Sequence, residues 1–244
     1  MTYCLGIMTR EGLVMASDSR TNAGYDAVNV HRKMHTFVKP GERVFFLLTS
    51  GSLSISQSVI SLLQKDWDAG EGLMKADTLY DAARSIGEKI RFVSDLDREA
   101  LEKDDFKFNI NVILGGQIGQ QTPYLYQIYP QGNPLAASEE TPYLQVGEAK
   151  YGRPILDRGV HYEHTTVDTA AKYALISLDS TMRSNLTVGP PIDLLVYKKD
   201  ELDILRQRRF TEKDPDLRAI RTQWEQTLRK GVAEIPPITF WTGQ

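Results

Sequence analysis

Apolar residues in the first fifty positions form three short blocks that predict β-strands. Residues 3–7 (YCLGI) and 12–17 (GLVMAS) are joined through the sequence TREG, which is the spacing of a β-hairpin. The run RVFFLLTSG at 43–51 is almost continuously apolar, a pattern typical of a strand that is buried on both faces. Between these blocks, SDSRTN at 17–22 is rich in turn-forming residues, so we expect a turn there.

After Gly51 the pattern changes to the period of amphipathic helices. Apolar residues recur at helical spacing over 55–63 and again over 79–93, with Asp77 as the expected N-cap of the second helix. Alternation of apolar and polar residues then returns over 106–114, which predicts a strand with one core face.

The second half of the chain alternates strands with helices. The sequences at 123–133 (PYLYQIYPQGN) and 142–147 (PYLQVG) predict two further strands, the first as a hairpin partner of the strand before it. A helix is expected from about 166 to 184, and a final pair of strands at 191–207.

The last predicted helix, 214–230, has clear end signals. Asp214 is the expected N-cap, Pro215 occupies the first position, and Gly231 lies just beyond the end. Its apolar stripe consists of Leu217, Ile220, Trp224 and Leu228. Because monomers rarely leave such a stripe exposed, we expect this helix to pack on a neighbouring subunit rather than on its own core.

The order of these elements predicts the fold class. Antiparallel sheets need covering layers, and the order is strands, two helices, strands, one helix, strands and one helix. We therefore expect an α+β fold, a four-layer αββα sandwich of two antiparallel sheets. No repeat or linker divides the chain, so we expect a single domain over 1–244 with a C-terminal helical extension at about 211–244.

Composition excludes several classes of protein. Hydrophobic residues make up 41% and charged residues 25%, as in ordinary globular domains. The net charge of −3 gives no electrostatic reason to expect nucleic acid, and no apolar run reaches the roughly 18 residues that cross a membrane. The single cysteine excludes a disulfide within the chain and a Cys-rich metal site. With no secretory signal in view, we expect a cytoplasmic protein without metal or cofactor.

Thr2 follows Met1 directly, and this raises the main chemical hypothesis. If Met1 is removed, residue 2 carries a hydroxyl group and a free α-amine, a nucleophile with its own base. The reference pKa of that amine is about 7.7–8.0, and a nearby lysine cation would lower it. We expect Lys33 to supply the cation, Asp18 to hold Lys33, and Gly51 to offer a backbone N–H group to a developing oxyanion.

Each of these residues also has a plain structural explanation. Many proteins begin Met-Thr without catalysis, and Asp18 could simply stabilise the predicted turn. Lys33 could be a solvated side chain, and Gly51 could be no more than a sharp turn into a helix. The order and spacing of all four features carry more weight than any one of them.

Together the four features resemble proteasome β-type subunits, which are N-terminal nucleophile (Ntn) hydrolases. The family pattern is a processed threonine, an Asp-Ser-Arg after the second strand, a lysine about fifteen residues later and a strand–Gly–helix junction. Here these positions are Thr2, Asp18-Ser19-Arg20, Lys33 and Ser50-Gly51. The single Met before the threonine, the sequence SNLTVGPPID and the helical tail are similar to the bacterial Anbu branch, the proposed ancestral β subunit. The resemblance covers about residues 2–198.

The resemblance implies the Ntn-hydrolase fold and a threonine peptidase or amidase acting on a peptide or protein substrate. It also implies a homo-oligomer, as a ring or a helical stack, and no cofactor, and it leaves an ATPase partner undetermined. Position in the family suggests a substrate pocket around Thr49 and Leu53. Two other functions stay open: a binding scaffold with little turnover, and an Ntn amidase that acts on a small molecule.

The sequence departs from the family pattern around the nucleophile. The family's Gly-Ser-Gly corresponds to VGEAKYG, which places Glu148 where the assisting serine would be. The family's Asp-x-x-Ser-Gly corresponds to a segment with Ser184-Asn185 for Ser-Gly and Thr181 in place of the aspartate. Asp179 is near but out of step. We expect Asp179 and Ser184 to support the site.

Overall fold

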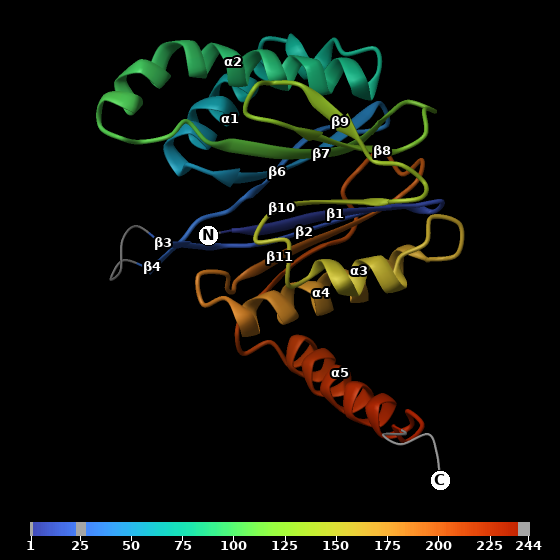
Figure 1. Ribbon diagram of the computed structural model, residues 1–244. Coiled ribbons are helices and arrows are strands. Elements are labelled where there is room, and N and C mark those ends of the chain that lie inside the picture. Colours follow the sequence, from blue (N-terminus) through green and yellow to red (C-terminus); the bar gives the residue numbers. More distant parts are fainter. Residues whose placement is uncertain (1, 23–27, 239–244) are drawn as a thin grey trace.

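The computed structural model, which describes residues 2–22 and 28–238, contains two five-stranded antiparallel sheets packed face to face (Figure 1). The first sheet contains, in spatial order, β10 (Tyr143–Gly147), β1 (Tyr3–Thr9), β2 (Gly12–Asp18), β11 (Ile192–Lys198) and β12 (Gln207–Phe210). The second contains β5 (Met34–Lys39), β6 (Arg43–Gly51), β7 (Ile110–Ile118), β8 (Tyr124–Ile128) and β9 (Pro134–Ala136). A separate ribbon pairs β3 (Arg20–Asn22) with β4 (Val28–Val30).

Helices cover the outer face of each sheet and complete four layers (Figure 1). The second sheet is covered by α1 (Leu53–Asp68), the 3₁₀ turn η1 (Gly72–Met74) and α2 (Leu79–Lys103). The first sheet is covered by α3 (Arg153–Gly159) and α4 (Val167–Ser184). The αββα sandwich expected from the sequence is confirmed. Among the helices of the described residues, none is both long enough and apolar enough to cross a membrane.

The alternation of side chains along the central strands fills three apolar layers. In β6, Phe45 and Leu47 pack against the helices α1 and α2, whereas Phe46 and Leu48 pack against the other sheet. All four side chains are fully buried. Both faces of such a strand are covered, which explains why its sequence is almost continuously apolar.

The structure corrects the predicted boundaries of several elements. The N-cap of α2 is Thr78 rather than Asp77, because Thr78 and Asp81 exchange hydrogen bonds in a capping box. Residues 20–22, which were expected in a turn, form β3. The second strand of the last pair is displaced from its predicted place, since β12 begins only at Gln207 and runs through a basic segment to Phe210.

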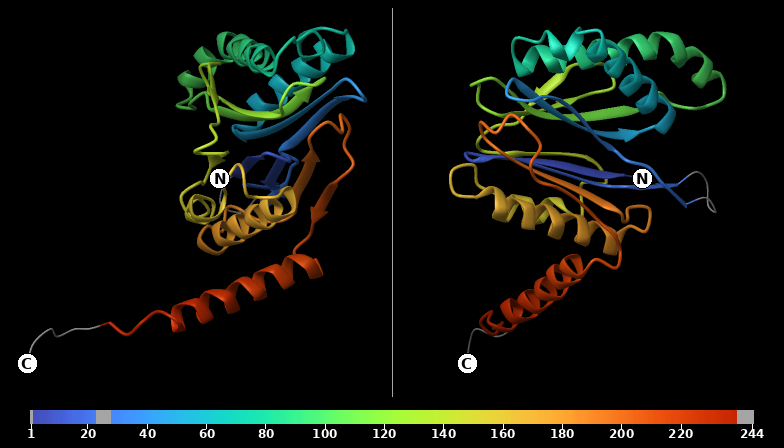
Figure 2. Two further views of the ribbon diagram at one scale, coloured as in Figure 1. Left: turned by 90° about the vertical axis from the view of Figure 1, so that its right-hand side faces the viewer. Right: turned by 180° about the vertical axis from the view of Figure 1, so that it is seen from behind.

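The helix α5 (Pro215–Ala233) lies outside the four layers and packs on α4 with its N-terminal half (Figure 2). Asp214 is its N-cap, as expected, but the helix continues past Gly231. Leu217 is buried in the core beneath α4, so the expectation that the helix packs only on a neighbouring subunit is wrong for this half. Leu228, in the other half, is 49% exposed.

Candidate active site

The backbone of Thr2 is fixed by the pairing of β1 with β10. Tyr3 pairs with Gly147, and the carbonyl oxygen of Thr2 accepts a hydrogen bond from the N–H group of Glu148 at 2.8 Å. Gly147 has a φ of +87°, and a Cβ atom at this position would overlap the Thr2 carbonyl oxygen. Only glycine fits here, so the local sequence holds residue 2 against the end of β10.

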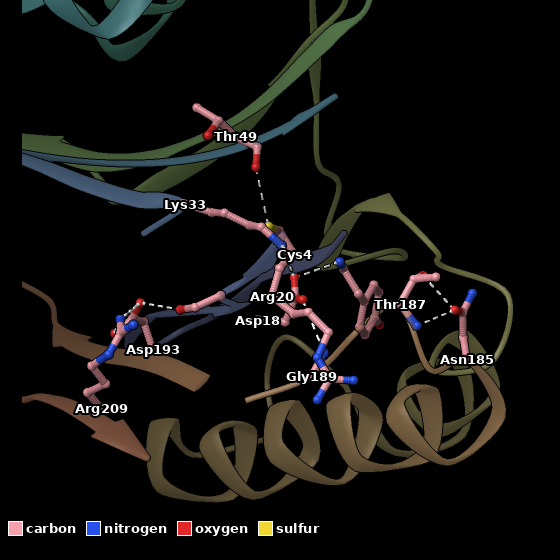
Figure 3. A network of polar contacts seen from close by, with 12 residues as sticks. Cys4, Asp18, Arg20, Lys33, Thr49, Asn185, Thr187, Gly189, Asp193 and Arg209 are labelled. Carbon is pink, nitrogen blue, oxygen red and sulfur yellow. Dashed lines mark hydrogen bonds and ion pairs between the residues drawn. The ribbon is translucent and has the colours of Figure 1, made fainter. Parts of the chain in front are cut away.

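Asp18 and Lys33 form a buried ion pair at the start of β1 (Figure 3). The Lys33 Nζ atom lies 2.6 Å from Asp18 Oδ1, and the exposed fractions of the two side chains are 7% and 0%. The N–H group of Tyr3 donates to the same Oδ1 atom at 3.0 Å, and that of Gly189 donates to Oδ2 at 3.2 Å. Lys33 also donates to the carbonyl oxygen of Arg20 at 2.7 Å. The pair is therefore anchored on both sides.

The charge of Asp18 depends on these partners. Burial raises the pKa of the Asp18 carboxyl group, while the Lys33 ammonium group and the backbone N–H groups of Tyr3 and Gly189 oppose that rise. Removing one member of a buried ion pair leaves the other charge uncompensated, which destabilises a protein by about 3–5 kcal/mol. The Asp18–Lys33 pair therefore both stabilises the folded chain and keeps the positive charge of Lys33 in one place.

Thr2 lines two adjoining hollows. The larger, of about 430 Å³, is lined by Thr2, Ser50, Gly51, Asn109, Asn111 and Gly147. The smaller is lined by Thr2, Thr21, His31, Lys33, Thr49, Ser50, Gly51, Leu53 and Ser56. The fold therefore brings most of the predicted residues together: Thr2, Lys33 and Gly51 of the proposed machinery, and Thr49 and Leu53 of the proposed pocket.

Gly51 occupies a backbone position that requires glycine. Its φ is +111°, and a Cβ atom would overlap the carbonyl oxygen of Asn109, the residue before β7. The same oxygen accepts a hydrogen bond from the N–H group of Ser52, the N-cap of α1, at 2.8 Å. The chain thus turns directly from β6 into α1, and the partial positive charge of the helix N-terminus lies beside the hollows.

Asp179 and Ser184 lie outside this group. The Asp179 carboxylate is 3% exposed and binds Arg221 of α5 at 2.6 Å, which ties α5 to α4. Ser184 is the exposed last residue of α4. Thr181, at the position of the family aspartate, is buried and donates its hydroxyl proton to the Ser177 carbonyl oxygen. In the described residues, neither hollow is lined by any of the three.

Sequence reasoning did not identify two asparagines of the site, Asn109 and Asn111. Both line the larger hollow, where side-chain amides can hydrogen-bond to an extended substrate. The sequence could have indicated both asparagines, because they occupy polar positions of the alternating segment FKFNINVIL. The buried contacts of Glu148 were also missed, because its partner Asn185 comes from a distant segment.

The Cys4 thiol, close to Thr2 in the sequence, is not suited to act as a nucleophile. Burial raises the pKa of the Cys4 thiol, and its Sγ atom lies 3.6 Å from the carbonyl oxygen of Thr49, so the thiol stays protonated. Over residues 2–22 and 28–238, no three His, Cys, Asp or Glu side chains come together in a way that could hold a metal ion.

Solved structures similar to this one include several of the Anbu group. An Anbu (ancestral beta-subunit) structure from Yersinia bercovieri is 42% identical, with a TM-score of 0.91 over 98% of this chain and 100% of that one. An Anbu (Gly-1) mutant from Hyphomicrobium sp. strain MC1 is 40% identical, with the same TM-score and coverage. A structure described as the helical assembly of the Anbu complex from Pseudomonas aeruginosa is 42% identical, with a TM-score of 0.87 and 98% of both chains covered.

Sequence comparison gives the same assignment. The family model described as "Proteasome subunit" matches residues 2–196. A protein described as proteasome subunit beta from Haloferax volcanii is 28% identical over 210 residues, which cover 86% of this chain and 78% of the relative. The chain therefore belongs to the proteasome β-type family and, within it, to the Anbu branch.

Proposed function

We propose that this protein hydrolyses peptide or amide bonds, with the hydroxyl group of Thr2 as nucleophile after removal of Met1. The observation that carries the proposal is the buried Lys33–Asp18 pair, which also binds the N–H group of Tyr3, the residue next to Thr2. A fixed positive charge thus lies beside the hollows that Thr2 lines. Membership of the proteasome β-type family supports the same chemistry.

In the proposed reaction, the α-amine of Thr2 accepts the proton of its own hydroxyl group, directly or through one water. The Oγ atom attacks the carbonyl carbon, and the N–H group of Gly51 stabilises the oxyanion. The carbon–nitrogen bond then breaks, and the leaving amine takes the proton from the α-ammonium group. Water, deprotonated by the same amine, hydrolyses the resulting ester and regenerates Thr2.

Lys33 acts in this proposal through its charge. An α-amine with a pKa of about 7.7–8.0 is mostly protonated at pH 7, and a nearby cation favours the neutral form that serves as base. Asp18, which is fully buried, holds the lysine in place through its hydrogen bond to Lys33.

Met1 lies outside the described residues, and its removal is part of the proposal. A peptide nitrogen is not a base, so the self-base mechanism requires the free α-amine of Thr2. We expect the intact mass of the active protein to correspond to a chain that starts at Thr2. Active protein that retains Met1 throughout would contradict the mechanism.

The proposal is tested by comparing wild type, Thr2→Ala and Thr2→Ser on a panel of unfolded proteins, short peptides and small amides. We expect turnover in the wild type, reduced turnover in Thr2→Ser, and none in Thr2→Ala, which still allows Met1 to be removed. Turnover by Thr2→Ala at the wild-type rate would show that another residue is the nucleophile.

The same panel separates the two alternative functions. A binding scaffold with little turnover is favoured by the departure from the family pattern beside Thr2, where Glu148 replaces the family serine and binds Asn185. Binding of peptides without hydrolysis would support it. Turnover confined to small amides would favour the small-molecule amidase.

We also propose a cytoplasmic homo-oligomer, built as a ring or a helical stack. The solved relative from Pseudomonas aeruginosa is described as a helical assembly, and the exposed part of α5 offers Leu228 and Val232 for contact with a second copy. Residues 239–244 of the expected C-terminal extension lie outside the described residues. A double variant, Leu228→Glu with Val232→Glu, should reduce the mass measured by light scattering, whereas Gln226→Glu should leave it unchanged. An unchanged mass in the double variant would contradict this interface.

A further inference from the structure

Glu148 is a buried carboxylate that the proposed mechanism does not use. It follows β10 directly, and its N–H group donates to the carbonyl oxygen of Thr2 at 2.8 Å, so residue 148 lies opposite residue 2 across the ladder. Its side chain is 8% exposed. Cross-strand neighbours of this kind have Cβ atoms roughly 4.5–5.5 Å apart. A glutamate side chain at position 148 is long enough to reach residue 2 across this distance.

A neutral network fixes the position of this carboxylate. The Asn185 Nδ2 atom donates to Glu148 Oε2 at 2.8 Å. The Asn185 Oδ1 atom accepts hydrogen bonds from both the N–H and hydroxyl groups of Thr187, at 3.0 and 2.6 Å (Figure 3). Because Oδ1 is occupied in this way, the amide group must direct its nitrogen toward Glu148.

The segment that contains Asn185 also contacts the opposite side of β1. Four residues after Asn185, the N–H group of Gly189 donates to Asp18 Oδ2, and Asp18 Oδ1 accepts from Tyr3. One short segment, 185–189, therefore holds a carboxylate on each side of the start of β1. Residue 2 is bracketed between them.

Among the residues that the structure describes, no buried cationic group pairs with the Glu148 carboxylate. Within residues 2–22 and 28–238, the cationic group paired with it is that of Lys150, whose Nζ atom lies 3.5 Å away and whose side chain is 69% exposed. Exposed pairs of this kind contribute little, whereas burying an unpaired carboxylate is strongly unfavourable. A buried positive charge at this point would offset that penalty.

We propose that the Glu148 carboxylate is the counter-ion of the α-ammonium group that Thr2 carries once Met1 is removed. The inference rests on the proposed function only in requiring that removal. Glu148 is then a positioning residue, which holds the α-amine at the end of β10 and leaves the Thr2 side chain free to face the hollows.

This role opposes that of Lys33. The charged groups beside the first residues of β1 are Glu148, which follows β10, Asp18 at the end of β2, Lys33 before β5 and exposed Lys150, with His31 on the wall of the smaller hollow. Negative groups favour the protonated amine, and positive groups favour the neutral amine. Glu148 therefore shifts the proposed base toward its protonated form and moves the pH range of its action upward.

The test follows the α-amine itself. Purified protein is acylated with a trace of isotopically labelled acetic anhydride at a series of pH values, and the N-terminal peptide is quantified by mass spectrometry. In Glu148→Gln, which keeps the shape and an acceptor for Asn185, the midpoint of amine labelling should fall by about one pH unit or more. In Lys150→Gln, the midpoint should stay close to that of the wild type.

The outcomes separate this inference from the proposed function. An α-amine that titrates identically in wild type and Glu148→Gln overturns the counter-ion role alone. Retention of Met1 overturns both, and turnover by Thr2→Ala overturns the nucleophile but not the counter-ion. If Glu148→Gln does not fold, Glu148→Ser, which carries the residue expected in the family, provides the same comparison.

Discussion

Asp18 and Glu148 are both buried beside the first residues of β1, yet their partners differ in kind. Asp18 binds a buried cation and two backbone N–H groups, whereas Glu148 binds a side-chain amide and an exposed lysine. The first carboxylate is thus compensated by the folded chain itself. The second keeps a negative charge that a further cation can compensate.

The difference shows how two similar groups can be separated into distinct roles. A carboxylate that is paired with a buried cation holds both side chains in one position. Separating the pair would leave each charge buried without a partner, which is strongly unfavourable. A carboxylate held by neutral donors can still pair with an ammonium group. We therefore assign Asp18 to holding Lys33, and Glu148 to the α-amine of Thr2.

The largest effect is expected from Lys33→Ala. This change leaves Asp18 buried without its cation and removes the positive charge beside Thr2. The free energy of unfolding should fall by about 3–5 kcal/mol, and turnover on the substrate panel should be lost. Denaturant unfolding and the panel assay measure the two effects.

Lys150→Ala is the matched control, since it removes a lysine from the other carboxylate. Lys150 is exposed, so its loss should change the free energy of unfolding by less than about 0.5 kcal/mol. Equal effects of the two lysine substitutions would show that the two carboxylates do not differ as described.

The free energy of unfolding, measured as a function of pH, tests the two carboxylates only after the contribution of His35 is known. Burial, with a smaller contribution from the charge of His31, lowers the pKa of His35 to about 4. The unfolded chain binds this proton near pH 6.5, so stability is lost as the pH falls from about 6.5 to about 4, by up to about 3 kcal/mol. His35→Gln should remove this loss, as measured by unfolding at several pH values, and the exposed His164→Gln should not. A pH dependence that persists in His35→Gln would have to be assigned to the carboxylates.

A smaller effect is expected from Asn185→Leu, which removes the amide that donates to Glu148. Leaving a buried acceptor without its donor should reduce the free energy of unfolding by about 1–3 kcal/mol, measured by denaturant unfolding. The neighbouring Ser184→Ala, at an exposed position, should be close to neutral. A neutral Asn185→Leu would contradict the role given to this network.

Much of the fold could be predicted because its signals are local. The apolar run at 43–51 correctly predicts a strand that is buried on both faces. The strand predicted at 106–114 exists but begins only at Ile110 and continues to Ile118, and Phe106 is exposed. The predicted positions of Thr2, Lys33 and Gly51 also depended on short-range patterns, and the fold brings these residues around the same hollows. The N-cap of α2 was misplaced by one residue, because Asp77 and Thr78 are both suitable capping residues.

The remaining parts depend on contacts between distant segments. Asp179 was expected near the site, but its partner Arg221 comes from a helix whose docking on α4 the local pattern does not reveal. The environment of Glu148 depends on Asn185, which lies 37 positions later in the chain. An amphipathic stripe indicates that one face of a helix is covered, but it does not indicate which segment covers it. For this reason the N-terminal half of α5, whose Leu217 is buried against its own core, was assigned to another subunit.

Mapping a covalent adduct shows which residue of the protein is the nucleophile. A panel of short peptide epoxyketones, which need both a hydroxyl group and an α-amine on one residue, is incubated with protein whose intact mass shows that Met1 has been removed. We expect one adduct, located on Thr2 by peptide mass spectrometry and absent from Thr2→Ala and Lys33→Ala. A protein that turns over substrate but forms no adduct on Thr2, or whose adduct persists in Thr2→Ala, would contradict the proposed role of Thr2.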